Sequence, residues 1–257
     1  MTLMTGRTVF VTGASSGIGQ ACATAFAAAG ARVLMCARRR ARLEALCVQL
    51  RQDFDSDVFA FDLDVQNRQS VADVVAGLPE EWKAIDVLVN NAGLSRGLVP
   101  LQDGLIDDWE EMIDTNVKGL LYVSRAILPG MIERGSGHVI NIGSIAGREV
   151  YPNGAAYCAS KYAVTALTKG MRLDLNGSGV QVSTVDPGLV NTEFSSVRFH
   201  GDQSRADATY NGMTPLSGED IAEAVLWVAA RPAHVNIAEM LVLPVDQASA
   251  TVVHRRP

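Results

Sequence analysis

The stretch Thr12-Gly13-Ala14-Ser15-Ser16-Gly17-Ile18-Gly19 decides how this chain begins to fold. It lies between a β-branched run at residues 7–11 and an Ala-rich segment of helical period at residues 18–29. Glycines in such a turn let the backbone approach a pyrophosphate, and the N-terminus of the following helix favours negative charge. The strand–turn–helix context is the one that this glycine pattern requires. The stretch therefore predicts a dinucleotide-binding unit.

The same alternation of strand and helix patterns continues along the chain. Further β-branched runs occupy residues 32–36, 58–61, 85–89, 138–142, 180–185 and 239–243, separated by segments of helical period. This order is typical of one parallel sheet with helices on both faces. We find no linker or internal repeat, so we predict a single α/β domain over residues 1–257, a Rossmann-type doubly wound sheet of seven strands. The polar stretch at about 191–215 is interpreted as a substrate loop.

Composition narrows the classes of function. The 257 residues are 48% hydrophobic, and 28 acidic against 22 basic residues give a net charge of −6 without a long block of like charges. A nucleic-acid partner is therefore not expected. Neither a signal-peptide pattern nor a run of ~18 apolar residues is found, which predicts a cytoplasmic protein with no membrane partner. The four cysteines lack the spacing of a metal site or a disulfide framework, so we expect neither.

The residue about 20 positions after the glycines distinguishes NAD from NADP sites. An acidic residue there binds the ribose 2′-hydroxyl of NAD, whereas an arginine accommodates the 2′-phosphate of NADP. Here Ala37 occupies that place, and Arg38 and Arg39 follow directly. We therefore expect NADP(H) as the cofactor. The alternative is that these arginines only solvate the start of a helix.

A tyrosine and a lysine stand four residues apart at Tyr157 and Lys161. Reduction of a carbonyl needs a proton donor beside the developing alkoxide, and oxidation of an alcohol needs the same group in reverse. A lysine one helical turn away favours the phenolate, so we expect the tyrosine pKa to be lowered from about 10. Ser144 follows the fifth expected strand, at the carboxyl edge of the sheet where α/β sites form. These residues predict an oxidoreductase site.

Further motifs identify a family. With the glycine turn, the segments Asn90-Asn91-Ala92-Gly93, Tyr157-Cys158-Ala159-Ser160-Lys161 and Asp186-Pro187-Gly188 resemble the short-chain dehydrogenase/reductase family over essentially the whole chain. The resemblance implies a catalytic tetrad of Asn116, Ser144, Tyr157 and Lys161, with Asn116 bending its helix and holding a water in a proton relay. The cofactor-binding residues that the motifs and the resemblance indicate are Gly13, Ser15, Ser16, Gly17, Ile18, Gly19, Arg38, Arg39, Asp64, Val65, Asn90, Ala92, Gly93, Tyr157, Lys161, Pro187, Gly188, Val190 and Thr192.

Within this family the chain resembles bacterial NADP-dependent 3-hydroxy acid dehydrogenases, on segments that include residues 78–82, 109–116, 187–190, 192–199 and 232–237. This implies L-serine, related 3-hydroxy acids or malonic semialdehyde as the small-molecule substrate. An anionic substrate needs a cation near the reacting carbon. Arg198 is the first candidate, with Arg148 and His200 after it. The alternatives are a reductase of sulfoacetaldehyde, neutral ketones or acyl-carrier 3-ketoacyl thioesters, and a non-catalytic NADP-binding sensor.

The resemblance also implies a homotetramer, assembled through the two helices that bear Asn116 and Tyr157. Small residues on the second helix would permit close packing, although alanine suits any buried helix. No role is indicated for the tail at residues 251–257.

Overall fold

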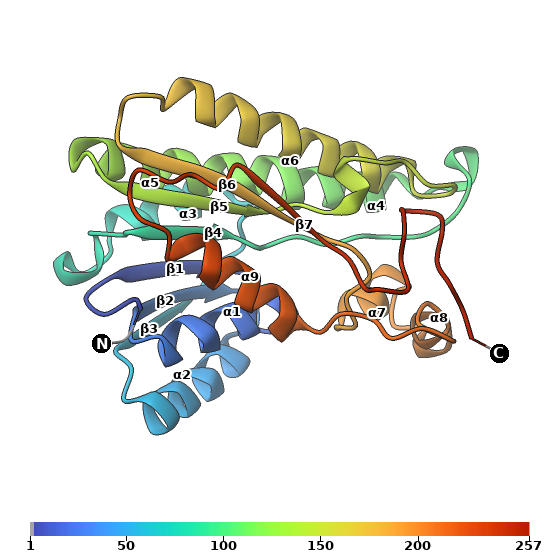
Figure 1. The fold of residues 1–257 in the computed structure, drawn as a ribbon, viewed down its shortest axis with the longest axis horizontal. Coiled ribbons are helices and arrows are strands. Elements are labelled where there is room, and N and C mark those ends of the chain that lie inside the picture. The colour runs from blue at the N-terminus through green and yellow to red at the C-terminus, as the bar shows by residue number, and fades with distance from the viewer. Residues whose placement is uncertain (1–2, 257) are drawn as a thin grey trace.

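The computed structural model describes residues 3–256. Seven parallel strands form one sheet in the order β3-β2-β1-β4-β5-β6-β7 (Figure 1). The strands are β1 (Thr8–Thr12), β2 (Arg32–Ala37), β3 (Val58–Asp62), β4 (Val87–Asn90), β5 (Gly137–Ile142), β6 (Val180–Pro187) and β7 (Glu239–Val242). The predicted fold class is confirmed, because every expected strand is present and its ends lie within two residues of those expected.

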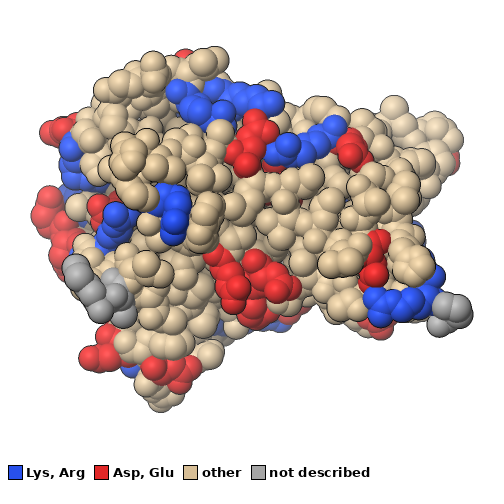
Figure 2. Space-filling view, viewed as in Figure 1, with Lys and Arg blue, Asp and Glu red and all other residues tan. Residues whose placement is uncertain are grey.

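Helices cover both faces of the sheet (Figure 1). One hydrophobic core joins the sheet to α1 (Gly17–Ala28), α2 (Arg40–Phe54) and α9 (Gly218–Ala229). A second core on the other face joins it to α3 (Arg68–Ala76), α5 (Leu120–Glu133) and α6 (Ala155–Asp174). Within residues 3–256, no helix is long and apolar enough to cross a membrane. On the face shown in Figure 2, acidic side chains separate the groups of lysine and arginine.

The order of the strands fixes where a ligand can bind. β1 pairs with β2 on one side and with β4 on the other, so the chain changes direction across the sheet at this point. In open α/β sheets, ligands bind beyond the carboxyl ends of the strands at such a switch point. Gly13, at the end of β1, has a φ of +66°, and a Cβ there would lie 2.9 Å from Ala92 Cα after β4. Only glycine allows these two turns to come so close.

The stretch at residues 191–215 is more ordered than a polar loop. It contains the short helices α7 (Phe194–Arg198) and α8 (Gln203–Ala208). The two ends of the stretch meet where the Asn191 N–H donates to the Leu216 carbonyl at 2.8 Å. The tail packs against it, since Arg255 Nη2 donates to the Thr209 carbonyl and the Arg256 N–H to the Gly212 carbonyl. We call residues 191–215 the substrate loop. Hydrogen bonds therefore hold its two ends together and hold Thr209 and Gly212 to the C-terminal tail.

One buried histidine makes stability depend on pH. His138 in β5 is 2% exposed, and its Nε2 lies 2.7 Å from Ser183 Oγ in β6. Its Nδ1 has no hydrogen-bond partner within residues 3–256. Burial lowers the pKa of His138 from 6.5 to about 4, and the charge of Arg7 acts in the same direction. The folded chain therefore disfavours a proton that the unfolded chain accepts.

We expect the free energy of unfolding to fall as the pH drops below about 6.5, with a contribution from His138 of about 2 kcal/mol between about pH 7 and pH 5. The sign follows because the pKa is lower in the folded state, so the unfolded state binds more protons in this window. Urea denaturation of the wild type and of His138→Asn, which has no proton to gain, measures the contribution. An equal loss of stability in the two proteins would contradict the assignment.

Candidate active site

A cavity of about 650 Å³ lies at the carboxyl ends of the strands, where the switch point predicts it. The glycine turn, the segment after β4, the start of α6 and the substrate loop all border it. The predicted site residues that line the cavity are Gly13, Ser15, Ser16, Gly17, Ile18, Arg38, Arg39, Asp64, Val65, Ala92, Gly93, Ser144, Tyr157, Lys161, Pro187, Gly188, Val190, Thr192 and Arg198. The sequence motifs thus come together around one space.

Two residues expected to bind the cofactor lie outside the lining of this cavity. Asn90 is buried and its amide donates to Ser124 Oγ and Asn141 Oδ1, both at 2.9 Å. A Cβ on Gly19 would lie 2.3 Å from Asn91 Nδ2, so this glycine allows α1 to pack against the turn. Both residues lie in the framework behind the cavity wall, and their contact with the cofactor stays a prediction.

Tyr157 and Lys161 lie on consecutive turns of α6, and both are less than 10% exposed. Lys161 Nζ donates to the Ile142 carbonyl at 2.9 Å and lies 6.0 Å from the centre of the Tyr157 ring. Ser144 caps the short helix η4 (Ile145–Gly147), and its Oγ accepts from the Ala146 N–H at 3.1 Å. The three side chains border the same part of the cavity.

The expected lowering of the tyrosine pKa is wrong for this structure. Burial raises the pKa of Tyr157 well above 10, nearby Tyr151 adds to this, and Arg198 and a hydrogen bond with Ser144 oppose it. Burial also lowers the pKa of Lys161 to about 8, against the charge of Asp186. The reason is desolvation, which disfavours phenolate and ammonium alike. At neutral pH Tyr157 therefore carries its proton and can donate it.

Asn116 lies where the helix is distorted, as expected. The π-helical segment η3 (Asp114–Gly119) joins α4 (Ile106–Ile113) to α5, and single π turns often occur at functional sites. The Asn116 amide accepts from the Leu94 N–H at 2.8 Å and donates to the Leu94 carbonyl at 2.8 Å and to Ser160 Oγ at 3.0 Å. Asn116 is 2% exposed and does not line the cavity. It fixes the segment that follows Gly93.

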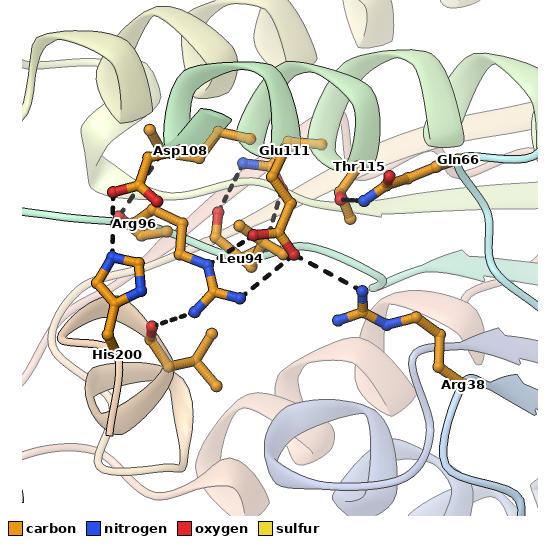
Figure 3. A network of polar contacts seen from close by, with 12 residues as sticks. Arg38, Gln66, Leu94, Arg96, Asp108, Glu111, Thr115 and His200 are labelled. Carbon is orange, nitrogen blue, oxygen red and sulfur yellow. Dashed lines mark hydrogen bonds and ion pairs between the residues drawn. The ribbon is translucent and has the colours of Figure 1, made fainter. Parts of the chain in front are cut away.

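Arg38 and Arg39, which follow β2, line the cavity. Arg39 donates from Nε to Ser15 Oγ at 3.1 Å and from Nη2 to Ser16 Oγ at 2.6 Å. Arg38 Nη1 lies 3.6 Å from Glu111 on α4, and Figure 3 marks this ion pair with a dashed line. No acidic residue stands at position 37, where NAD sites have a carboxylate. The arginines and the open glycine turn therefore fit a dinucleotide that carries a 2′-phosphate.

The three candidate cations for the substrate have different surroundings. Arg198 on α7 lines the cavity, with its guanidinium carbon 5.2 Å from the centre of the Tyr157 ring. Arg148 is an ion-pair partner of Asp186 and Glu239, and His200 Nε2 lies 3.1 Å from Asp108 (Figure 3). Neither of these two lines the cavity. Arg148 and His200 are each held by carboxylates outside the cavity lining, and their contact with the substrate stays a prediction.

One residue that the sequence reasoning missed connects the cavity to the substrate loop. Arg96 lines the cavity, pairs with Glu111 at 2.7 Å and donates to the Val197 carbonyl at 2.6 Å (Figure 3). The N–H of the next residue, Gly97, donates to the Arg198 carbonyl at 2.9 Å. The sequence gives one signal for this residue, an arginine three residues after the Asn-Ala-Gly motif. It does not indicate which residues this arginine contacts.

Comparisons with known proteins agree with this geometry. NADP-dependent 3-hydroxy acid dehydrogenase YdfG of Salmonella typhi is 49% identical over 249 residues, which cover 96% of this chain and 99% of that protein. Sulfoacetaldehyde reductase 2 of Chromohalobacter salexigens is 45% identical over 249 residues, with coverage of 96% and 98%. A solved closed form of serine dehydrogenase complexed with NADP+ is 45% identical, with a TM-score of 0.90 over 97% of this chain and 100% of that chain.

A family model gives the most general match. The model of the short chain dehydrogenases matches residues 7–203. This range includes the glycine turn, Ser144, Tyr157 and Lys161, which the fold places around one cavity. The chain belongs to the short chain dehydrogenase family.

Proposed function

We propose that this chain is an NADP-dependent dehydrogenase of small 3-hydroxy acids, such as L-serine or 3-hydroxypropionate, and of the corresponding semialdehydes. The observation that carries the proposal is Arg198. Its guanidinium lies beside the Tyr157 ring and, within residues 3–256, has no carboxylate partner, while Nε and Nη2 donate to Ser95 Oγ and the Tyr151 hydroxyl at 3.0 Å. A half-buried cation next to a proton donor favours a substrate whose carboxylate lies close to its hydroxyl.

We assign the roles of the residues from their positions and from the resemblance to the family. Tyr157 gives its proton to the carbonyl oxygen during reduction and receives it from the alcohol during oxidation. Ser144 orients that oxygen, Lys161 is a cation at the nicotinamide ribose, and Asn116 keeps the segment after Gly93 in place. When bound, the cofactor accepts the hydride from the alcohol carbon or returns it to the carbonyl carbon. Ser15, Arg38 and Arg39 hold the adenosine 2′-phosphate.

Two further parts of the proposal are the location of the enzyme and its assembly. We place the enzyme in the cytoplasm, as one catalytic domain over residues 1–257 that forms a homotetramer. Exposed small residues along α6, among them Ala155, Ala159 and Ala166, allow a second copy to approach closely. Light scattering at micromolar concentration should give four times the chain mass; a monomer mass would contradict the assembly.

A sulfonate is the second candidate substrate. The relative named sulfoacetaldehyde reductase is nearly as similar as the hydroxy acid dehydrogenases, and the Arg198 guanidinium can bind a sulfonate as well as a carboxylate. A neutral ketone or a carrier thioester would leave the Arg198 guanidinium without an anionic partner. A non-catalytic sensor would have no use for the proton donor Tyr157 beside the cavity.

Initial rates of NADP+ reduction distinguish these candidates. The substrates are L-serine, 3-hydroxypropionate, 3-hydroxyisobutyrate, isethionate and a neutral alcohol of the same size, with NAD+ tested in parallel. We expect the carboxylates to exceed the neutral alcohol by about 10-fold or more in kcat/KM. Faster turnover of isethionate would select the sulfonate, and equal turnover of the neutral alcohol would remove the acid specificity. A preference for NAD+ would contradict the assignment of Arg38 and Arg39.

A further inference from the structure

A buried carboxylate lies directly behind the wall of the active site. Asp186 in β6 is fully buried and does not line the cavity. Its carboxylate fills the space that a side chain at Gly143 would need, because a Cβ there would lie 1.9 Å from Asp186 Oδ1. Gly143 stands between Ser144 and Ile142, whose carbonyl accepts from Lys161 Nζ. The lack of a side chain at this one position therefore admits a negative charge at the end of β5.

This carboxylate belongs to a group of three charged side chains. Arg148 Nε donates to Asp186 Oδ2 at 2.7 Å, and Arg148 Nη2 donates to Glu239 Oε2 at 2.9 Å. Thr184 Oγ1 donates to Asp186 Oδ1 at 2.6 Å. Two carboxylates thus share one guanidinium, so Asp186, Arg148 and Glu239 together carry one negative charge. We call these three side chains the Asp186 cluster.

The outer end of the Asp186 cluster is open to water. Lys169 Nζ lies 3.5 Å from Glu239 Oε1, and the Lys169 side chain is 55% exposed. Water and salt screen an ion pair of this kind, so Lys169 cancels little of the negative charge further inside. The Asp186 end of the cluster lies in the interior, where charges are screened much less.

Lys161 is the cation that this negative charge faces. It is 7% exposed, and a buried ammonium tends to lose its proton unless a negative charge lies near it. Burial lowers the pKa of Lys161 to about 8, and the charge of Asp186 opposes a further fall. The carboxylate and the ammonium are joined through one short stretch of β5, since Asp186 packs on Gly143 and Lys161 donates to Ile142.

The other groups around Lys161 supply no negative charge among the residues that the structure describes. Tyr157 on the same helix carries its proton at neutral pH, and Ser144 and Asn116 are uncharged. Arg198, whose guanidinium carbon lies 5.2 Å from the centre of the Tyr157 ring, is a second cation. Asp186 is therefore the group that can balance the charge of Lys161.

We propose that Asp186 is a positioning residue that keeps the positive charge on Lys161, and that Arg148 sets how strongly it does so. The inference rests on the role that the proposed function gives to Lys161, a cation at the nicotinamide ribose. There the charge of Lys161 also stabilises the negative charge that Tyr157 acquires when it passes on its proton. A purely structural ion pair between β6 and the turn after η4 is the alternative.

The charge of Lys161 can be measured without a substrate. The chain has four lysines, Lys83, Lys118, Lys161 and Lys169, and the other three side chains are about half exposed. In enzyme that carries lysine labelled with ¹³C at Cε, the NMR shift of each Cε follows the protonation of its Nζ. The Lys161 signal is assigned by its absence from Lys161→Arg, and its pKa is read from a pH titration.

Two variants that break the same ion pair should have opposite effects. Asp186→Asn removes the carboxylate, and we expect the pKa of Lys161 to fall by about one pH unit. Arg148→Gln leaves Asp186 without its cation, and we expect the pKa of Lys161 to rise by about half a pH unit. Lys169→Gln is the matched control, since it removes a cation at the exposed end and should leave the pKa of Lys161 within about 0.2 of the wild type.

Kinetics give a second measure in the direction of reduction. Because Tyr157 keeps its proton over this range, the loss of kcat on the alkaline side should follow Lys161. The midpoint of that loss should move to lower pH in Asp186→Asn and to higher pH in Arg148→Gln. A wild type inactive on hydroxy acids and semialdehydes would contradict the proposed substrate class and leave the NMR measurement unaffected.

An unchanged pKa of Lys161 in Asp186→Asn would overturn the proposal. A shift of the same sign in Asp186→Asn and Arg148→Gln would also overturn it, because a structural pair is lost equally in both. Thermal unfolding shows whether each variant is folded. If Asp186→Asn does not fold, Arg148→Gln alone decides, since an unchanged or lowered pKa of Lys161 in that variant contradicts the role of the Asp186 charge.

Discussion

Replacing Tyr157 with phenylalanine should lower kcat by about 10²- to 10⁴-fold, the usual contribution of a positioned general acid or base. The substitution removes one oxygen from a residue that is 8% exposed and leaves the ring, which contacts Phe194 edge-on at 5.7 Å between centres. The cavity wall and the arginines after β2 are unchanged. NADPH binding, measured by fluorescence titration, should therefore remain within about twofold of the wild type.

The pH dependence provides an independent measure of the same residue. Because burial raises the pKa of Tyr157, the phenol is protonated at neutral pH, so alcohol oxidation should increase as the pH rises. Tyr157→Phe should lose this increase together with the rate. Tyr162→Phe is the matched control, because the Tyr162 hydroxyl donates to the Arg148 carbonyl and is not part of the cavity lining. Wild-type turnover by Tyr157→Phe would show that another group transfers the proton.

Replacing Arg198 with glutamine should lower kcat/KM for 3-hydroxypropionate by about 10- to 100-fold, the value of one charge-assisted hydrogen bond of about 1.5–3 kcal/mol. Glutamine can still hydrogen-bond to Ser95 or Tyr151 but has no charge for the carboxylate. For a neutral alcohol of equal size, kcat/KM should change by less than about threefold. The ratio of kcat/KM for the acid to kcat/KM for the neutral alcohol therefore separates the effect of the Arg198 charge from the effect of any change in the shape of the loop.

Arg205→Gln controls for a general effect of removing a cation from the substrate loop. Arg205 lies on α8 with its guanidinium carbon 4.4 Å from the centre of the Phe199 ring, and it does not line the cavity. This variant should retain the preference for the acid. An equal loss for the acid and the neutral alcohol in Arg198→Gln would show that the residue supports the loop and does not bind the carboxylate.

Local patterns in the sequence were sufficient to predict the seven-stranded sheet and the position of the site at its carboxyl edge. Each strand has its own short, mainly apolar run, and the glycine turn needs only the strand before it and the helix after it, so these features involve residues close together in the chain. Tyr157 and Lys161 share a face of α6 because four residues make about one helical turn. Ser144 lines the same cavity, whereas Asn116 lies behind it and bonds to Leu94.

The sequence by itself therefore determined the fold class and the cofactor type. Only the tertiary structure decided which charged groups remain available to a ligand, because their partners are distant in sequence. Arg39 and Glu193 are 154 positions apart, and Arg148 and Glu239 are 91 positions apart. The pKa of Tyr157 likewise depends on burial, which several distant segments create together. Periodicity and motif spacing report on neighbours along the chain, whereas desolvation and ion pairing depend on neighbours in space.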